Sequence, residues 1–193
     1  MLSLNLKTFA IETFEIAERN VLKAIFRLKP KDLEKQITPK LNPIRWIIGH
    51  LTMHMDTIFN YLCLGERKLS REYRDYFTTG LEREEEKSFP LTYEELIETF
   101  LEFSNISFSY LYNLPEEKFT ELPEHNDENN TETVSELIQR ISLHFLGHTG
   151  QIYLVKRELG KGGYFVAGLK KKNRDTSRIK WLEWWNKNKA KYS

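Results

Sequence analysis

Four of the five histidines in this sequence form two pairs with identical spacing, His50 with His54 and His144 with His148. Residues four apart are neighbours one turn along an α-helix, so each pair is predicted to share a helix face. The second pair lies in the stretch HFLGHTGQ, residues 144–151, within a longer amphipathic pattern. There the two histidines and the final glutamine occupy positions at which an apolar stripe would place leucine or isoleucine.

All four imidazoles are therefore expected at or near the interior of their helices. The first pair adjoins the apolar stripe of its segment, and the second continues a stripe that begins at Leu137 and Ile141. A buried ring nitrogen without a partner costs roughly 1–3 kcal/mol. A metal ion satisfies one nitrogen on each ring, and neighbouring acceptors take the other. The spacing thus predicts a divalent-metal site, since zinc, nickel, iron and copper ions all accept imidazole.

Other kinds of reactive site find little support in the sequence. It contains no HExxH, no Glu-x-x-His pair of the di-iron bundles and no CxxC. The GKGG stretch near residue 160 follows a helical pattern rather than a strand, which argues against a dinucleotide-binding turn. Cys63 lies about 13 Å along the helix from His54 and is expected to be a small buried hydrophobe. His125, in a polar acidic loop, is expected on the surface.

Helical periodicity predicts four elements that would position the histidines. They cover approximately residues 4–28, 43–64, 93–114 and 134–159. No alternating strand pattern occurs, so the sequence predicts an all-α fold, a four-helix bundle. The charged connector, residues 66–90, is expected to contain only a short piece, around Tyr73, Tyr76 and Phe77, packed against the bundle.

Local signals predict where these helices begin and end. Asn42 is the predicted N-cap of the second helix, with Pro43 at its first position and Gly65 after its end. The third and fourth helices open with capping boxes, formed by Thr92 with Glu95 and by Thr133 with Glu136.

The composition is that of an ordinary globular protein. The chain has 193 residues, 40% apolar and 30% charged, which suffices for one domain with a sizeable core and a small appendage. A net charge of +1 gives no general electrostatic attraction to nucleic acid or membranes. The single cysteine cannot form an internal disulfide, and no apolar run approaches the roughly 18 residues of a membrane span. We therefore expect a cytoplasmic protein without a signal peptide.

The tail, residues 161–193, differs from the predicted bundle domain, residues 1–160. It carries ten Lys or Arg and two acidic residues, a net charge of +8 against −7 for the rest. A short amphipathic helix is predicted at residues 177–189, where Trp181 and Trp185 share one face. We expect this face to dock on the bundle, leaving the lysines in solvent. The alternative is a basic, aromatic surface for nucleic acid, because Lys and Arg bind phosphate and Trp stacks on bases.

Two motifs resemble signatures of the DinB-like (DinB/YfiT) family of metal-binding four-helix-bundle proteins. NPIRWIIGHL, residues 42–51, resembles the family pattern N-x-x-x-W-x-x-x-H-[LI] at the start of the second helix. The stretch from His144 through His148 to Gln151 is similar to the family's fourth-helix pattern. The resemblance implies an up-up-down-down bundle, often a homodimer. It also implies one divalent ion held by His50, His144 and His148. We expect this ion to be zinc or nickel, with iron as a further candidate.

The better-understood relatives implied by this resemblance are thiol-dependent transferases and isomerases that use bacillithiol or mycothiol. A three-His site with open positions would bind a thiol as thiolate and present it to an electrophilic small molecule. Two alternatives remain open. One is a non-catalytic structural or sensing site that His54 closes as fourth ligand, and the other is a metal-assisted hydrolase that uses bound water.

Three further residues are expected beside the metal. Gln151, about one turn beyond His148, would contact a ligand or the substrate. Trp46, one turn before His50, would form a pocket wall or pack in the core. His54 is expected next to the site, facing substrate or hydrogen-bonding, because four rings converging from helices about 8–10 Å apart would be strained.

Overall fold

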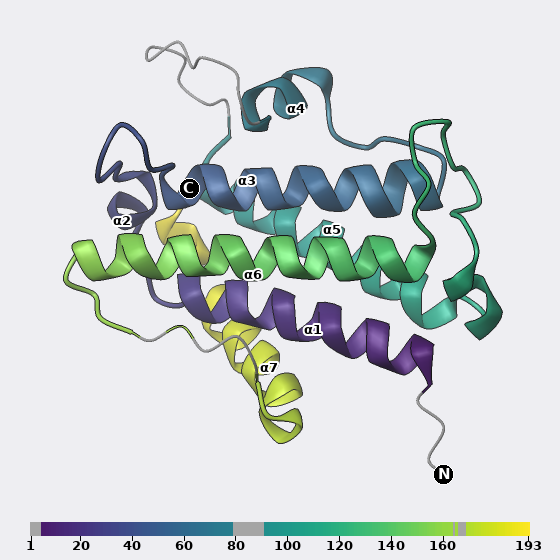
Figure 1. Ribbon diagram of the computed structural model, residues 1–193. Helices are drawn as coiled ribbons and strands as arrows, with labels where there is room; N and C mark the ends of the chain where they lie inside the picture. The colour runs from purple at the N-terminus through teal and green to yellow at the C-terminus, as the bar shows by residue number, and fades with distance from the viewer. Residues whose placement is uncertain (1–4, 79–90, 164, 166–168) are drawn as a thin grey trace.

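The computed structural model is a bundle of helices and describes residues 5–78, 91–163, 165 and 169–193 (Figure 1). The long bundle helices are α1 (Leu6–Ile25), α3 (Ile44–Met55) with its π-helical continuation η1 (Asp56–Cys63), α5 (Tyr93–Asn113) and α6 (Val134–Glu158). Shorter elements are α2 (Pro30–Glu34), α4 (Arg71–Phe77), η2 (Glu116–Thr120) and η3 (Lys189–Lys191), and the C-terminal helix is α7 (Lys171–Asn188). The described residues contain no strand, which confirms the all-α prediction. Among them, no helix has the length and apolar character that a membrane crossing requires.

Contacts near the helix ends show that α1 runs parallel to α6 and antiparallel to α5. Lys156 Nζ, near the end of α6, donates a 2.7 Å hydrogen bond to the carbonyl of Ala24, near the end of α1. Lys7 Nζ, at the start of α1, donates a 2.6 Å hydrogen bond to the carbonyl of Leu114, just after α5.

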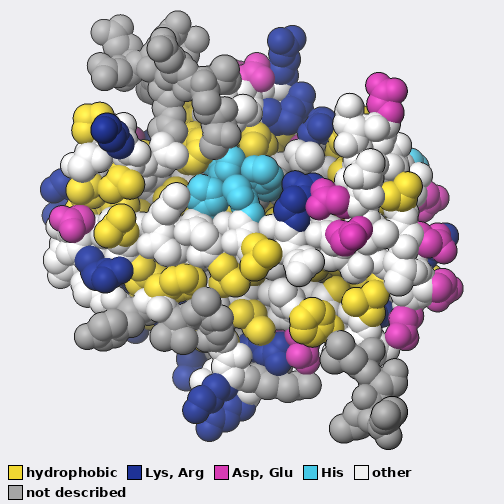
Figure 2. Space-filling model, viewed as in Figure 1, with side chains coloured by type: hydrophobic (Ala, Val, Ile, Leu, Met, Phe, Trp, Pro, Cys, Tyr) yellow, Lys and Arg dark blue, Asp and Glu magenta, His cyan; other side chains and the backbone are white. Residues whose placement is uncertain are grey.

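The helix α3 runs antiparallel to α6. Trp46, near the start of α3, faces His148, whereas His54, near the end of α3, faces His144. The order of directions is therefore up-down-down-up, and the expected up-up-down-down order is wrong. The end of α1 and the start of α3 lie at the same end of the bundle, whereas the end of η1 and the start of α5 lie at opposite ends (Figure 1). In the same view, histidine side chains gather in a central patch over α3 and α6 (Figure 2).

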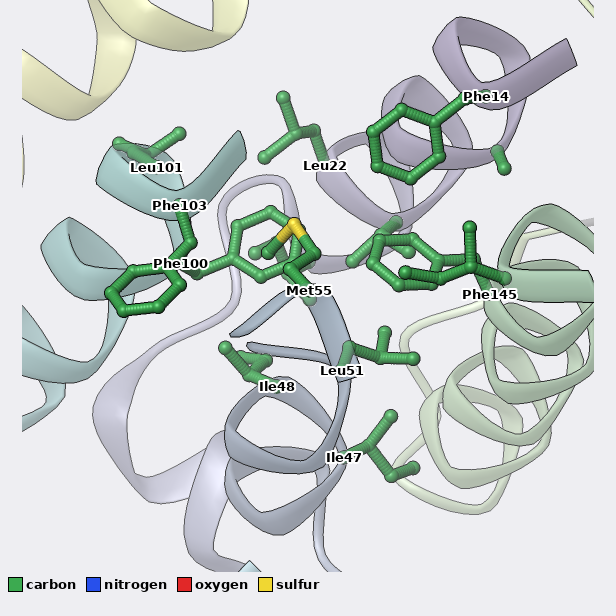
Figure 3. Close-up of a cluster of buried hydrophobic side chains, with 14 of the residues drawn as sticks. Phe14, Leu22, Ile47, Ile48, Leu51, Met55, Phe100, Leu101, Phe103 and Phe145 are labelled. Atoms are coloured by element: carbon green, nitrogen blue, oxygen red, sulfur yellow. The ribbon is translucent and has the colours of Figure 1, made fainter. Parts of the chain in front are cut away.

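Large apolar side chains from all four long helices fill the space between them (Figure 3). The centre of this core contains Phe14 of α1, Leu51 and Met55 of α3, Phe100 of α5 and Phe145 of α6, all fully buried. Burying a side chain of this size stabilises the fold by about 1.5–3 kcal/mol. The core holds α3 against α6 and so sets the distance between the two histidine pairs.

Most of the predicted helix ends are confirmed. The capping boxes at Thr92 and Thr133 are both formed. Gly65, two residues after the end of η1, has a φ of +81°, which a glycine adopts without strain. The start of α3 differs by one residue, because Pro43 rather than Asn42 is its N-cap.

The short helix predicted in the connector is confirmed as α4, which packs on the outside of α3. Tyr73 and Phe77 are buried, and the side chain of Ser70 caps the helix by accepting a hydrogen bond from Tyr73 N. Residue 4, at the expected start of the first helix, and residues 79–90 of the expected connector lie outside the described residues.

The helix α7 turns its tryptophans toward the bundle and begins earlier than the expected residue 177. Trp181 and Trp185 are buried, and Trp185 Nε1 donates a 2.7 Å hydrogen bond to Glu98 of α5. Lys180 and Lys187 lie on the exposed side.

A buried carboxylate links α7 to α1. Glu18 is fully buried and accepts hydrogen bonds from Ser104 Oγ at 3.0 Å, Arg19 Nη1 at 2.9 Å and Arg178 Nε at 3.2 Å. A buried charge without partners costs several kcal/mol, so the removal of α7 would leave Glu18 with fewer compensating groups.

We expect Trp185→Ala to lower the free energy of unfolding by about 3–5 kcal/mol, because it leaves a cavity between α7 and the bundle. Ile179→Ala on the same helix is the matched control, since Ile179 is 56% exposed and its loss should change stability by no more than about 0.5 kcal/mol. Urea unfolding measures both values. Equal stabilities of the two variants would mean that α7 does not dock through its tryptophans.

Candidate metal centre

His50 of α3 meets His144 and His148 of α6 midway along the bundle. One ring nitrogen from each histidine lies within 4.8 Å of the other two, so the three could hold a metal ion. Zinc binds imidazole at about 2.0–2.1 Å, which places tetrahedral ligand atoms about 3.3 Å apart. Modest side-chain rotations would bring the three nitrogens to that separation.

Within this group, His50 Nε2 and His144 Nε2 are 3.1 Å apart. Two ring nitrogens can face each other at this distance only if a proton lies between them or a cation binds both lone pairs. A metal ion could therefore take the place of the shared proton between these two nitrogens.

The histidines of α6 lie beside the apolar stripe rather than on it. The stripe continues from Ile141 through Phe145 and Ile152, which are buried, whereas His144 and His148 are half-buried and Gln151 is exposed. The expectation that these polar residues replace core positions is therefore wrong. Helical spacing from Ile141 allows either 144 or 145 as the next buried position, and the packing against α3 selects the phenylalanine.

The protonation of His50 is determined by a contact with α4. His50 is buried, and its Nδ1 lies 2.7 Å from the carbonyl oxygen of Phe77. A carbonyl only accepts hydrogen bonds, so Nδ1 carries the proton and Nε2 keeps its lone pair. Trp46 stacks on the His50 ring at a centroid distance of 4.5 Å and donates from Nε1 to the carbonyl of Tyr76. Trp46 is itself buried and packs in the core beside the site.

His148 has a corresponding partner on its own helix. Its Nδ1 lies 2.8 Å from Gln151 Oε1, an amide oxygen that accepts a hydrogen bond from the protonated Nδ1, so Nε2 is unprotonated. Partners of this kind fix the orientation of metal-binding histidines and raise their basicity.

His54 lies beside the three-histidine group. Its ring centroid is 4.5 Å from that of His50 and 4.3 Å from that of His144. Burial, reinforced by the neighbouring histidines, lowers the pKa of His54 to about 3 and that of His144 to about 4. Burial also lowers the pKa of His148. Metal binding requires deprotonated imidazoles, and these rings are neutral at pH 7.

Cys63 and His125 are placed as the sequence predicts. Cys63 is buried, and burial raises the pKa of its thiol to about 11. His125 is exposed on the loop before α6.

The chain matches the DinB superfamily over residues 13–152, a range that includes both histidine pairs. No curated protein and no solved structure matches it significantly. The match covers more than half of the chain, and the protein therefore belongs to the DinB superfamily.

The sequence reasoning did not identify the carbonyl of Phe77 as part of the site. Two signals pointed toward it. One is the aromatic cluster in the connector, and the other is Gly49, a glycine inside a helix directly before His50. Glycine inside a helix lowers stability relative to alanine, so its presence there indicates that another group occupies the space of a side chain.

We expect Cys63 in the folded protein to resist alkylation by iodoacetamide at pH 8. The thiolate is the reactive form, and a thiol with a pKa of about 11 has on the order of one molecule in a thousand as thiolate at that pH. Intact-mass spectrometry should show one adduct per chain only after unfolding in guanidinium chloride. Rapid labelling of the folded protein would show that the thiol is accessible and reactive.

Proposed function

We propose that His50, His144 and His148 bind one divalent metal ion, and that the protein is an enzyme using this ion. The observation that carries the proposal is the meeting of three ring nitrogens within 4.8 Å at a half-exposed edge of the bundle. Three protein ligands with access from solvent are typical of catalytic rather than structural zinc sites. All three ligands are imidazoles, which zinc, nickel and iron all accept, and we propose zinc or nickel as the ion, with iron as a further candidate.

The reaction that we propose is the transfer of a low-molecular-weight thiol to an electrophilic small molecule, or an isomerisation that depends on such a thiol. A bound divalent ion would lower the pKa of the thiol and stabilise its thiolate. The protein's own contribution is to orient the ligands. The Phe77 carbonyl accepts a hydrogen bond from His50 Nδ1, and Gln151 Oε1 accepts one from His148 Nδ1. The α6 histidines are half-buried, which would let small molecules reach the ion.

A second candidate is a non-catalytic metal site that His54 closes as fourth ligand. The 4.3 Å distance between the ring centroids of His54 and His144 favours it, because a rotation could bring the fourth ring to the ion. Against it, the nitrogens of His54 are not among the ligand atoms that lie within 4.8 Å of one another.

We expect protein prepared without a metal-affinity tag to contain one divalent metal ion per chain. His50→Ala, His144→Ala and His148→Ala should each reduce metal binding by at least about tenfold, because each removes one of three ligands. The control is His125→Ala, which removes an exposed histidine that is not part of the three-histidine group. Elemental analysis by mass spectrometry gives the metal content, and full occupancy in any two of the ligand variants would contradict the site.

His54→Ala separates an open site from a closed one. For the open site we expect metal affinity to fall less than about tenfold, and an added thiol to change the visible spectrum of the cobalt-substituted protein. A loss of metal as large as that of His148→Ala, together with no thiol response in the parent protein, would identify a closed four-histidine site. Turnover with water alone would instead favour a metal-assisted hydrolase.

A further inference from the structure

The C-terminal end of α4 points carbonyl groups at the metal centre. The last four carbonyl groups of any α-helix have no partner within that helix. In α4 two of these carbonyls, those of Tyr76 and Phe77, accept hydrogen bonds from Trp46 Nε1 at 3.2 Å and His50 Nδ1 at 2.7 Å. Thr78 has extended backbone angles and ends the helix at this point.

Gly49 allows α4 to approach α3 closely enough for these bonds. A Cβ atom on Gly49 would lie 2.2 Å from the Phe77 ring atoms Cε1 and Cζ, far inside any real contact distance. The Phe77 ring is fully buried against this part of the α3 backbone. Glycine in a helix interior is less stable than alanine by about 1 kcal/mol, so the close contact with α4 gives a physical reason for its presence.

The segment that leads into α4 is hydrogen-bonded to η1, the continuation of α3. Asp56, fully buried at the start of η1, accepts hydrogen bonds from Lys68 N at 2.9 Å and from Leu69 N at 3.4 Å. Asn60 Nδ2 donates a further hydrogen bond to the same carboxylate at 3.1 Å. The short helix is therefore attached to the bundle before its first residue and at its last one.

We infer that α4 is a positioning element for the metal centre, and that Gly49 and Phe77 are the residues through which it acts. The Phe77 carbonyl keeps His50 in the Nδ1-protonated tautomer and directs its Nε2 lone pair toward the histidines of α6. A displaced α4 would free the ring to rotate or to change tautomer. This inference rests on the proposed metal site, and it assigns control of that site to a helix outside the bundle.

Two glycines make a matched test, because each directly precedes a proposed ligand inside a helix. A Cβ on Gly49 would collide with Phe77, whereas a Cβ on Gly147 meets nothing within 4 Å. Gly49→Ala should weaken zinc binding by about tenfold to hundredfold, the range typical for losing a partner of a ligand histidine. It should also change the visible absorption of the cobalt-substituted protein. Gly147→Ala should keep the affinity and the spectrum of the parent.

The tautomer of His50 can be measured in the unaltered protein, which keeps the inference testable if Gly49→Ala does not fold. Nitrogen-15 NMR of the metal-free protein should show His50 protonated at Nδ1 and unprotonated at Nε2. The Nε2-protonated tautomer, or a folded Gly49→Ala variant with the parent's affinity and spectrum, would overturn the role of α4. Absence of metal binding in the parent protein would overturn the proposed function itself and the inference with it.

Discussion

The antiparallel contact between α3 and α6 is the constraint on which the histidine cluster depends. Two helices that run in opposite directions bring an early residue of one opposite a late residue of the other. Trp46 therefore faces His148, and His54 faces His144. His50 lies between these two levels and contacts both histidines of α6. A parallel arrangement of the same helices would pair the histidines in a different order.

The histidine cluster lies at the edge of the apolar core, where the imidazoles are desolvated without all being fully buried. The large apolar side chains lie deeper, where Leu51 and Phe145 pack between the helices (Figure 3). Burial keeps His144 neutral at pH 7, and His144 and His148 are nonetheless only half-buried. Neutral rings with accessible lone pairs are what a divalent metal requires. The carbonyl of Phe77 in α4 accepts a hydrogen bond from His50 Nδ1, and the side-chain amide of Gln151 in α6 accepts one from His148 Nδ1.

The C-terminal helix shows how opposite charges within one chain can be used for packing. The first 160 residues carry a net charge of −7 and the tail +8. Arg174 and Arg178 of α7 lie 3.2 Å from Glu12 and Glu18 of α1, respectively, in a largely buried interface. Part of the tail's basic character is thus explained by internal ion pairs, while the exposed lysines remain in solvent.

The sequence by itself determined the features that depend on near neighbours along the chain. Capping boxes at Thr92 and Thr133 involve residues three apart, and the histidine pairs involve residues four apart, so local backbone geometry is sufficient to predict them. The family signatures around His50 and His148 are equally local, and they identified the superfamily correctly. Only the tertiary structure decided the helix directions, the choice of Phe145 over His144 as the buried residue, and the contact between Phe77 and His50. Each of these depends on which surfaces meet across long stretches of chain, and helical periodicity carries no information about the partner that a face will find.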